Sequence, residues 1–213
     1  MSREAKILTA ILVVVVGGLV GLFVVMNGGT DSSTSSDKVD TKVLLPEGVH
    51  NEGTGSVQLV EFGDYQCGPC GALHPGLKKL KQEFGANLNF VFRNLPLTTL
   101  HKNALAAAQA AEAARMQSRF WEMHDLLYEN QDALEDEYLA RYAAALGLDA
   151  ERLIREVLAG AHTARVREDF RSGAHLGVNG TPSFFINGVR YDGGPDVEEL
   201  LTALTEQPPR RAT

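Results

Sequence analysis

The only two cysteines of the 213-residue chain lie three positions apart, in the run Cys67-Gly68-Pro69-Cys70. A disulfide between them closes a loop of about four residues and stabilises a fold by about 2 kcal/mol, against about 3 kcal/mol for a fifteen-residue loop. The pair is therefore a poor structural staple. It is better suited to being formed and broken, because the partner thiol is always close. The run favours a redox site, with half of a zinc site or two incidental thiols as the alternatives.

A zinc site normally needs two further cysteine or histidine ligands at recognisable spacing. The chain has no third cysteine, and its six histidines are scattered along the sequence. Its formal net charge of −7 is unfavourable for a surface that binds nucleic acid. We therefore expect a redox pair that uses no metal and no organic cofactor, and we expect no nucleic-acid partner.

The N-terminal region indicates the compartment. Residues 7–26 carry no charged side chain, and as a helix they would span about 30 Å, the thickness of a bilayer core. Arg3 and Lys6 precede them, so residues 1–6 are expected to stay in the cytoplasm and the rest of the chain to lie outside. The alternatives are a cleaved signal peptide and a buried core helix. We predict a retained anchor, followed by a flexible polar linker over residues 27–42, in a compartment where disulfides persist.

The redox pair lies between a predicted strand and a predicted helix. The apolar run 57–62 is typical of a buried strand, and residues 88–92 form a second one. Between them, apolar residues recur at three- and four-residue intervals from Cys70 to Phe84, which predicts a half-buried helix. Cys67 is therefore expected at a helix N-terminus, with Pro69 in the first turn.

The remaining sequence predicts a helical block and then a second half of the sheet. Asn187-Gly188 separates two short strand-like runs, 183–186 and 189–191, and favours a hairpin. Asp196 is expected to cap a final helix. The order strand–helix–strand, helical block, strand–strand–helix describes a small sheet with a helical insertion. The helices of the block are predicted over residues 101–117, 120–128, 135–146, 150–159 and 163–176.

Four stretches together carry a resemblance to a known family. They are the redox loop Phe62-Gly63-Asp64-Tyr65-Gln66-Cys67-Gly68-Pro69-Cys70, the helix proline Pro75, the run Phe120-Trp121-Glu122-Met123-His124-Asp125, and the loop Val178-Asn179-Gly180-Thr181-Pro182-Ser183-Phe184. In this order they resemble the thioredoxin superfamily, and within it the membrane-anchored DsbA-like branch, over roughly residues 57–206. The resemblance implies an α/β thioredoxin fold over residues 43–207, with a helical insertion at about 99–176, one N-terminal transmembrane helix and a disordered tail at 208–213.

The two cysteines are expected to play different parts. A helix N-terminus offers backbone N–H groups and a positive dipole end, so Cys67 should form the thiolate and act as the nucleophile. Cys70 lies one turn further in and should be the shielded, resolving thiol. Gly68 and Pro69 shape the turn between them. This Gly-Pro pair is that of thioredoxin itself and implies a more reducing couple than the Pro-His pair of strongly oxidising family members.

The resemblance also implies roles for three residues outside the cysteine run. Glu61 stands where the family carries a buried acid, which would exchange a proton with Cys70; an exposed strand face is the alternative. Pro182 is expected to be cis and to face the cysteines, with the backbone of Thr181 pairing with substrate. The Thr181 hydroxyl is expected to tune the stability of the Cys67 thiolate; the alternative is that Thr181 is an ordinary turn residue. His74 is expected to be buried beside Pro75 rather than to assist the thiols.

These features predict a membrane-tethered, extracytoplasmic protein thiol–disulfide oxidoreductase. Its expected substrates are reduced or misoxidised exported proteins, and the resemblance implies an integral-membrane redox partner, quinone-linked in the oxidising direction. The alternative within the class is a reductase or isomerase kept reduced by a membrane electron donor. The alternative outside it is a non-catalytic peptide-binding or folding-assistance module.

Overall fold

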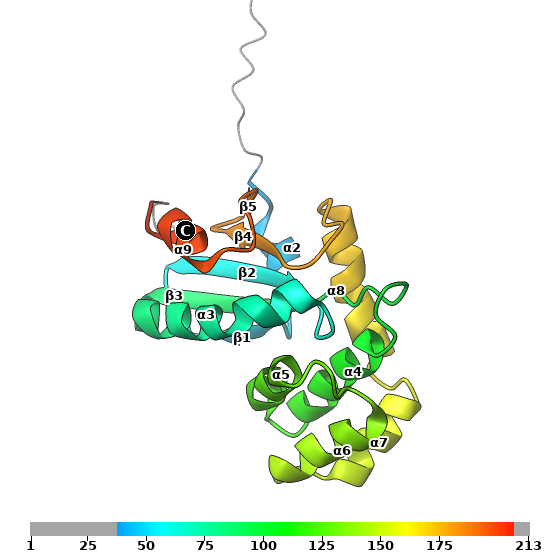
Figure 1. Cartoon of the computed structure of the whole chain (residues 1–213). Helices are drawn as coiled ribbons and strands as arrows, with labels where there is room; N and C mark the ends of the chain where they lie inside the picture. Colours follow the sequence, from blue (N-terminus) through cyan, green and yellow to red (C-terminus); the bar gives the residue numbers. More distant parts are fainter. Residues whose placement is uncertain (1–37, 207–213) are drawn as a thin grey trace, which may run out of the picture. The chain divides into compact units, whose positions relative to one another are not determined.

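The structure, a computed structural model, describes residues 38–206 (Figure 1). Its centre is a mixed five-stranded sheet with the strand order β1-β3-β2-β4-β5. Two central strands, β2 and β3, run parallel, and every other neighbouring pair is antiparallel. The strands are β1 (His50–Glu52), β2 (Val57–Gly63), β3 (Leu88–Asn94), β4 (Ser183–Ile186) and β5 (Val189–Tyr191).

Helix α3 (Gly68–Phe84) makes the crossover that joins β2 to β3, as parallel neighbours require. With α9 (Val197–Glu206) it covers one face of the sheet, over Leu59, Phe90 and Phe92. The other face carries Val60, Phe62 and Val91 under the single-turn α2 (Thr41–Leu44) and the end of α8. Because β2 is covered on both faces, its sequence is a nearly continuous apolar run rather than an alternating one.

The helical insertion lies between β3 and β4 and packs around one alanine-rich helix. In α4, seven alanines are buried, and small side chains allow neighbouring helices to approach closely. Two buried polar contacts join the insertion to the sheet: a hydrogen bond between His50 of β1 and Glu112 of α4, and an ion pair between Arg93 of β3 and Asp169 of α8. The insertion therefore forms one body with the sheet. Its helices are α4 (Ala104–Arg115), α5 (Phe120–Glu129), α6 (Asp136–Ala145), α7 (Ala150–Leu158) and α8 (Thr163–His175).

The predicted order of elements is confirmed, with two additions at the start of the domain. Strand β1 consists of three residues, His50-Asn51-Glu52, and such a short polar run has no apolar pattern to reveal it. Helix α2 is a single turn capped by Asp40. The Val39 backbone N–H donates to Gly188 O over 2.8 Å, so contacts with the domain extend to residues before the predicted boundary at 43, inside the predicted linker.

The predicted cytoplasmic segment, anchor and most of the linker (residues 1–37) lie outside the described residues, as does the predicted tail at 208–213. Between residues 38 and 206, none of the helices combines the length and the apolar character that a membrane crossing requires.

Candidate active site

Cys67 occupies the N-cap of α3. Strand β2 ends at Gly63, a tight turn follows, and the Cys67 backbone N–H donates to Asp64 O over 3.1 Å. Pro69 lies in the first turn, where a missing N–H removes no helical hydrogen bond. No side chain caps this helix end, so its unpaired N–H groups and the positive end of the helix dipole remain available to a negative charge on Cys67.

The two thiols have opposite acidities. The Cys70 thiol, which hydrogen-bonds the Cys67 sulfur, is the main cause that lowers the pKa of Cys67 to about 6. Burial of Cys70, which is 1 % exposed, raises the pKa of that thiol far above its ordinary value. At neutral pH the arrangement therefore stabilises a thiolate on Cys67 and a protonated thiol on Cys70.

The loop before β4 closes the site from the other side. The Thr181–Pro182 peptide bond is cis, as predicted, and the Cys67 thiol donates to Thr181 O over 3.2 Å. The predicted juxtaposition of this loop and the cysteines is thereby confirmed. The Thr181 hydroxyl is buried with no hydrogen-bond partner among the described residues, and it also lowers the pKa of Cys67.

The Thr181 hydroxyl gives a direct test of this electrostatic arrangement. Thr181→Val keeps the shape of the side chain and removes one hydrogen-bond donor, so we expect the pKa of Cys67 to rise by about one unit. The measurement is a pH titration of the thiolate by ultraviolet absorbance in the reduced protein. An unchanged titration would assign Thr181 an ordinary turn role.

Glu61 is buried, as predicted, on β2 between Phe92 of β3 and Phe184 of β4. Burial raises its pKa to about 8, although the Lys81 ammonium opposes the shift. One carboxyl oxygen, Oε2, is buried and has no hydrogen-bond partner within residues 38–206. The Glu61 charge contributes to the raised pKa of Cys70, so the two groups sense each other's ionisation.

The helical insertion contributes a residue that sequence reasoning did not assign. Gln131, in the loop after α5, donates from Nε2 to the carbonyl oxygens of Tyr65 and Cys67 over 2.9 and 2.8 Å. Its side chain lies directly over Gly71, where a Cβ atom would approach Gln131 Oε1 to 1.9 Å. A Cβ at Gly68, by contrast, would meet nothing within 4 Å. Gln131 therefore leaves no room for a side chain at position 71, whereas position 68 has room for one.

A buried aspartate precedes the redox pair. Asp64 accepts the Gln66 backbone N–H on Oδ1, and on Oδ2 it meets the Leu97 N–H and His101 Nδ1, each over 2.8 Å. The sequence offered one signal for it, a carboxylate three residues before Cys67, but two of its partners, Leu97 and His101, are more than thirty residues away.

Among the described residues, the group best placed to hold a metal ion is His74, His124 and Asp125, whose ligand atoms lie within 4.8 Å of one another. His74 is buried, as predicted. Each group already has a protein partner: Asp125 pairs with His74 and Lys78, and His124 Nδ1 with the Tyr65 hydroxyl. These contacts account for the cluster as a structural link between α3 and α5.

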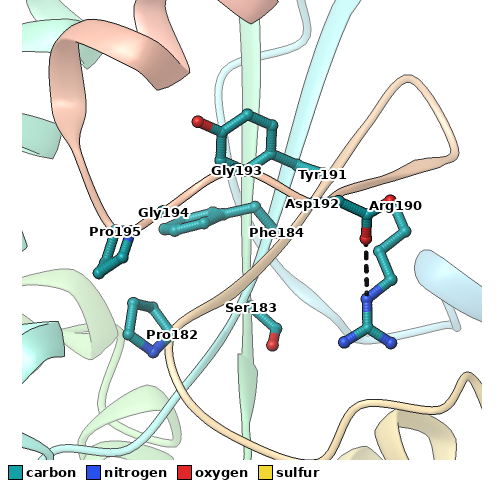
Figure 2. A pocket seen from close by; sticks show the side chains of 9 residues that line it. All are labelled: Pro182, Ser183, Phe184, Arg190, Tyr191, Asp192, Gly193, Gly194 and Pro195. Carbon is teal, nitrogen blue, oxygen red and sulfur yellow. Dashed lines mark ion pairs between the residues drawn. The ribbon is translucent and has the colours of Figure 1, made fainter.

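A cavity of about 190 Å³ lies beside the cis-proline loop. Figure 2 shows Pro182 and Pro195 on one side of Phe184 and the Arg190–Asp192 pair on the other, with 3.8 Å between Arg190 Nε and Asp192 Oδ1. The segment between β5 and α9 supplies the far wall, so the cavity combines ring surfaces with charged groups next to the site.

A Cys-x-x-Cys pair at the N-terminus of the first crossover helix, facing a cis-proline loop, defines a thioredoxin-like protein, and the helices between β3 and β4 give it the DsbA-like architecture. The chain belongs to the thioredoxin family, because residues 52–206 match the family model described as Thioredoxin. The predicted class, a thiol–disulfide oxidoreductase of DsbA-like type, is confirmed at the level of family and fold.

Solved structures with this fold include two bacterial proteins. One is a thioredoxin-like oxidoreductase from Silicibacter pomeroyi, 29 % identical, with a TM-score of 0.69 over 78 % of this chain and 96 % of that one. The other is BdbD from Bacillus subtilis, 23 % identical, with a TM-score of 0.68 over 74 % of this chain and 91 % of that one. The second likeness concerns the fold alone.

The chain is also similar to part of much longer proteins. It is 45 % identical over 150 residues to the Na(+)/H(+) antiporter NhaA 1 of Salinispora arenicola, a match that covers 70 % of this chain and 23 % of the antiporter. The chain thus spans about a quarter of the length of the curated relatives it matches. A match of this length must include much of the thioredoxin domain.

Proposed function

We propose that the protein is an extracytoplasmic protein thiol–disulfide oxidoreductase that forms or exchanges disulfides in exported proteins through Cys67 and Cys70. One observation carries the proposal: a thiol whose pKa is lowered to about 6 lies against a buried thiol whose pKa is raised. A pair of this kind reacts through one sulfur and resolves through the other.

In the oxidising direction a substrate thiolate attacks Sγ of Cys67, the Cys67–Cys70 bond breaks, and its electron pair leaves on Cys70. Cys70 takes a proton, for which Glu61 is the proposed source because its pKa of about 8 keeps it protonated at neutral pH. A second substrate thiolate then attacks the substrate sulfur and releases the Cys67 thiolate. The substrate gains one disulfide, and the pair leaves reduced.

The substrate chain is proposed to lie along the Thr181–Pro182 backbone as an added strand. Thr181 O lies 3.2 Å from Cys67 Sγ, which puts this backbone beside the reacting sulfur. The cavity next to Pro182 (Figure 2) would receive a side chain near the substrate cysteine. Its mixed lining suits substrates of varied sequence.

We further propose that residues 7–26 tether the domain to the outer face of a membrane and that an integral-membrane partner renews its redox state. The support is the uncharged length of this segment and the similarity to proteins named as antiporters, which work in a membrane. A quinone-linked oxidant serves the disulfide-forming direction, and a thiol reductant serves a reductase or isomerase.

The reduction potential tests both the activity and its direction. The pKa of Cys67, about 6, lies between the roughly 7 of thioredoxin and the roughly 3.5 of DsbA. We therefore expect a potential between about −270 and about −120 mV, nearer the thioredoxin end. The measurement is equilibration with glutathione or a dithiol peptide, followed by counting of the free thiols. Absence of exchange contradicts the proposed activity, a value of about −270 mV favours the reductase, and a value of about −120 mV favours the oxidant.

A non-catalytic peptide-binding module is the remaining candidate. It would use the cavity beside Pro182 without the cysteines. Binding of a cysteine-free peptide that survives removal of both thiols, without any thiol exchange in the wild type, is the result that would favour it.

A further inference from the structure

The buried carboxylate of Asp64, three residues before Cys67, has no part in the proposed chemistry. Its side chain is fully buried, and its three hydrogen-bond partners come from two segments. The Gln66 N–H belongs to the redox turn, whereas the Leu97 N–H and His101 Nδ1 belong to the segment that leads from β3 into α4. The insertion therefore reaches the redox turn through this carboxylate.

A second contact fixes the same segment to the turn. Asn103 donates its backbone N–H to Gln66 Oε1 over 2.7 Å, and the Leu95 N–H donates to Gly63 O over 2.8 Å. His101 is thus held on both sides along the chain, and its side chain is 23 % exposed. Asp64 Oδ2 and His101 Nδ1 are therefore paired at 2.8 Å, and Asp64 lies three residues before the reactive Cys67.

A negative charge this close to Cys67 opposes thiolate formation, and Asp64 does raise the pKa of Cys67. A hydrogen-bond donor on the same carboxylate draws its charge away from the sulfur. Asp64 and His101 should therefore act on Cys67 in opposite senses.

We propose that His101 is a positioning residue that holds Asp64 and offsets its charge, so that the pair sets how readily Cys67 carries a negative charge. The inference rests on the proposed function, because it assigns the insertion a part in controlling that redox pair. If so, the ionisation of Cys67 depends on His101, a residue that belongs neither to the sheet nor to the dipeptide between the cysteines.

Other groups that act on Cys67 come from three directions. Cys70 faces it from α3, Thr181 from the loop before β4, and Glu61 senses its charge from β2. Around Asp64, the ionisable groups of the described residues are His101, Cys67, Cys70 and Tyr128 of α5. Of these ionisable groups, only His101 hydrogen-bonds the Asp64 carboxylate. Removing His101 therefore isolates its influence on the charge that Asp64 presents to Cys67.

The test is a thiolate titration of reduced Cys67 by ultraviolet absorbance in the full chain, which needs no substrate. We expect His101→Ala to raise the pKa of Cys67 and Asp64→Asn to lower it, each by about half a unit, a roughly three-fold change in the thiolate-to-thiol ratio at a given pH. The double variant should titrate like Asp64→Asn alone. His101→Asn keeps a hydrogen-bond donor at the position of Nδ1. In this variant the pKa of Cys67 should rise by no more than half as much as in His101→Ala.

A purely structural role would move both single variants in the same direction, and that result would overturn the proposal, as would an unchanged titration in His101→Ala. If Asp64→Asn fails to fold, the contrast between His101→Ala and His101→Asn decides in the same way, and equal shifts contradict the positioning role. His162→Ala is the matched control: this histidine also pairs with a carboxylate, Glu156, at 2.8 Å, but between α7 and α8, and its loss should leave Cys67 unchanged. A titration that follows the prediction in a protein without exchange activity would refute the proposed function and not this inference.

Discussion

Replacing Cys67 with serine is expected to lower thiol–disulfide exchange by at least about a thousand-fold, because a serine hydroxyl forms no disulfide and the buried Cys70 is not reached by substrate. The measurement is insulin reduction in the presence of a thiol reductant, together with oxidation of a reduced dithiol peptide by the oxidised protein. Both assays should lose their catalysed rate.

Cys70→Ser is the matched partner of that variant. It keeps the reactive sulfur and removes the resolving one, so it should accumulate a mixed disulfide between Cys67 and substrate, visible as a covalent adduct that reductant releases. The same adduct should not form with Cys67→Ser. Retained catalysis in Cys67→Ser would mean that Cys67 is not the reactive group and would contradict the proposed chemistry.

The second large effect concerns Glu61 and the pH dependence of stability. The folded protein holds this proton with a pKa of about 8, because burial disfavours the charge, against an ordinary value of 4.5. The folded state therefore binds the proton more tightly than the unfolded chain does. This stabilisation is fully present below about pH 4.5 and is lost as the pH rises through about 8.

Glu61→Gln removes the titration and keeps the shape of the side chain. Relative to this variant, the wild type should lose on the order of 3 kcal/mol of unfolding free energy between about pH 5 and about pH 8. Denaturant unfolding of the reduced proteins at both pH values measures the difference. Glu198→Gln, which removes an exposed carboxylate from the first turn of α9, is the control and should follow the wild type. Parallel pH profiles for wild type and Glu61→Gln would show that Glu61 is ionised in the folded protein.

Local patterns were enough to place the reactive residues. The apolar run of β2 predicted that Glu61 is buried, and the helical spacing after Cys70 predicted that Cys67 begins a helix. The cis peptide bond at Pro182 and its place opposite the cysteines came from the resemblance to a family, since no property of the local sequence distinguishes a cis proline from a trans one.

Contacts between distant segments could not be predicted from the same patterns. Gln131 reaches Tyr65 and Cys67 across more than sixty positions, and a glutamine after a helix carries no signal of such a role. Asp64 and His101 are each ordinary polar residues of a loop until the fold brings them together. Their pairing depends on the path of the segment between β3 and α4, which is set by tertiary packing.

The contrast between Gly68 and Gly71 has a consequence for engineering. A side chain at position 68 projects into open space, whereas one at 71 collides with Gln131. The dipeptide between the cysteines can therefore be substituted without disturbing the rest of the fold. A library that varies position 68 and its neighbour Pro69 should yield a graded series of oxidants and reductants that share one fold and one pair of cysteines.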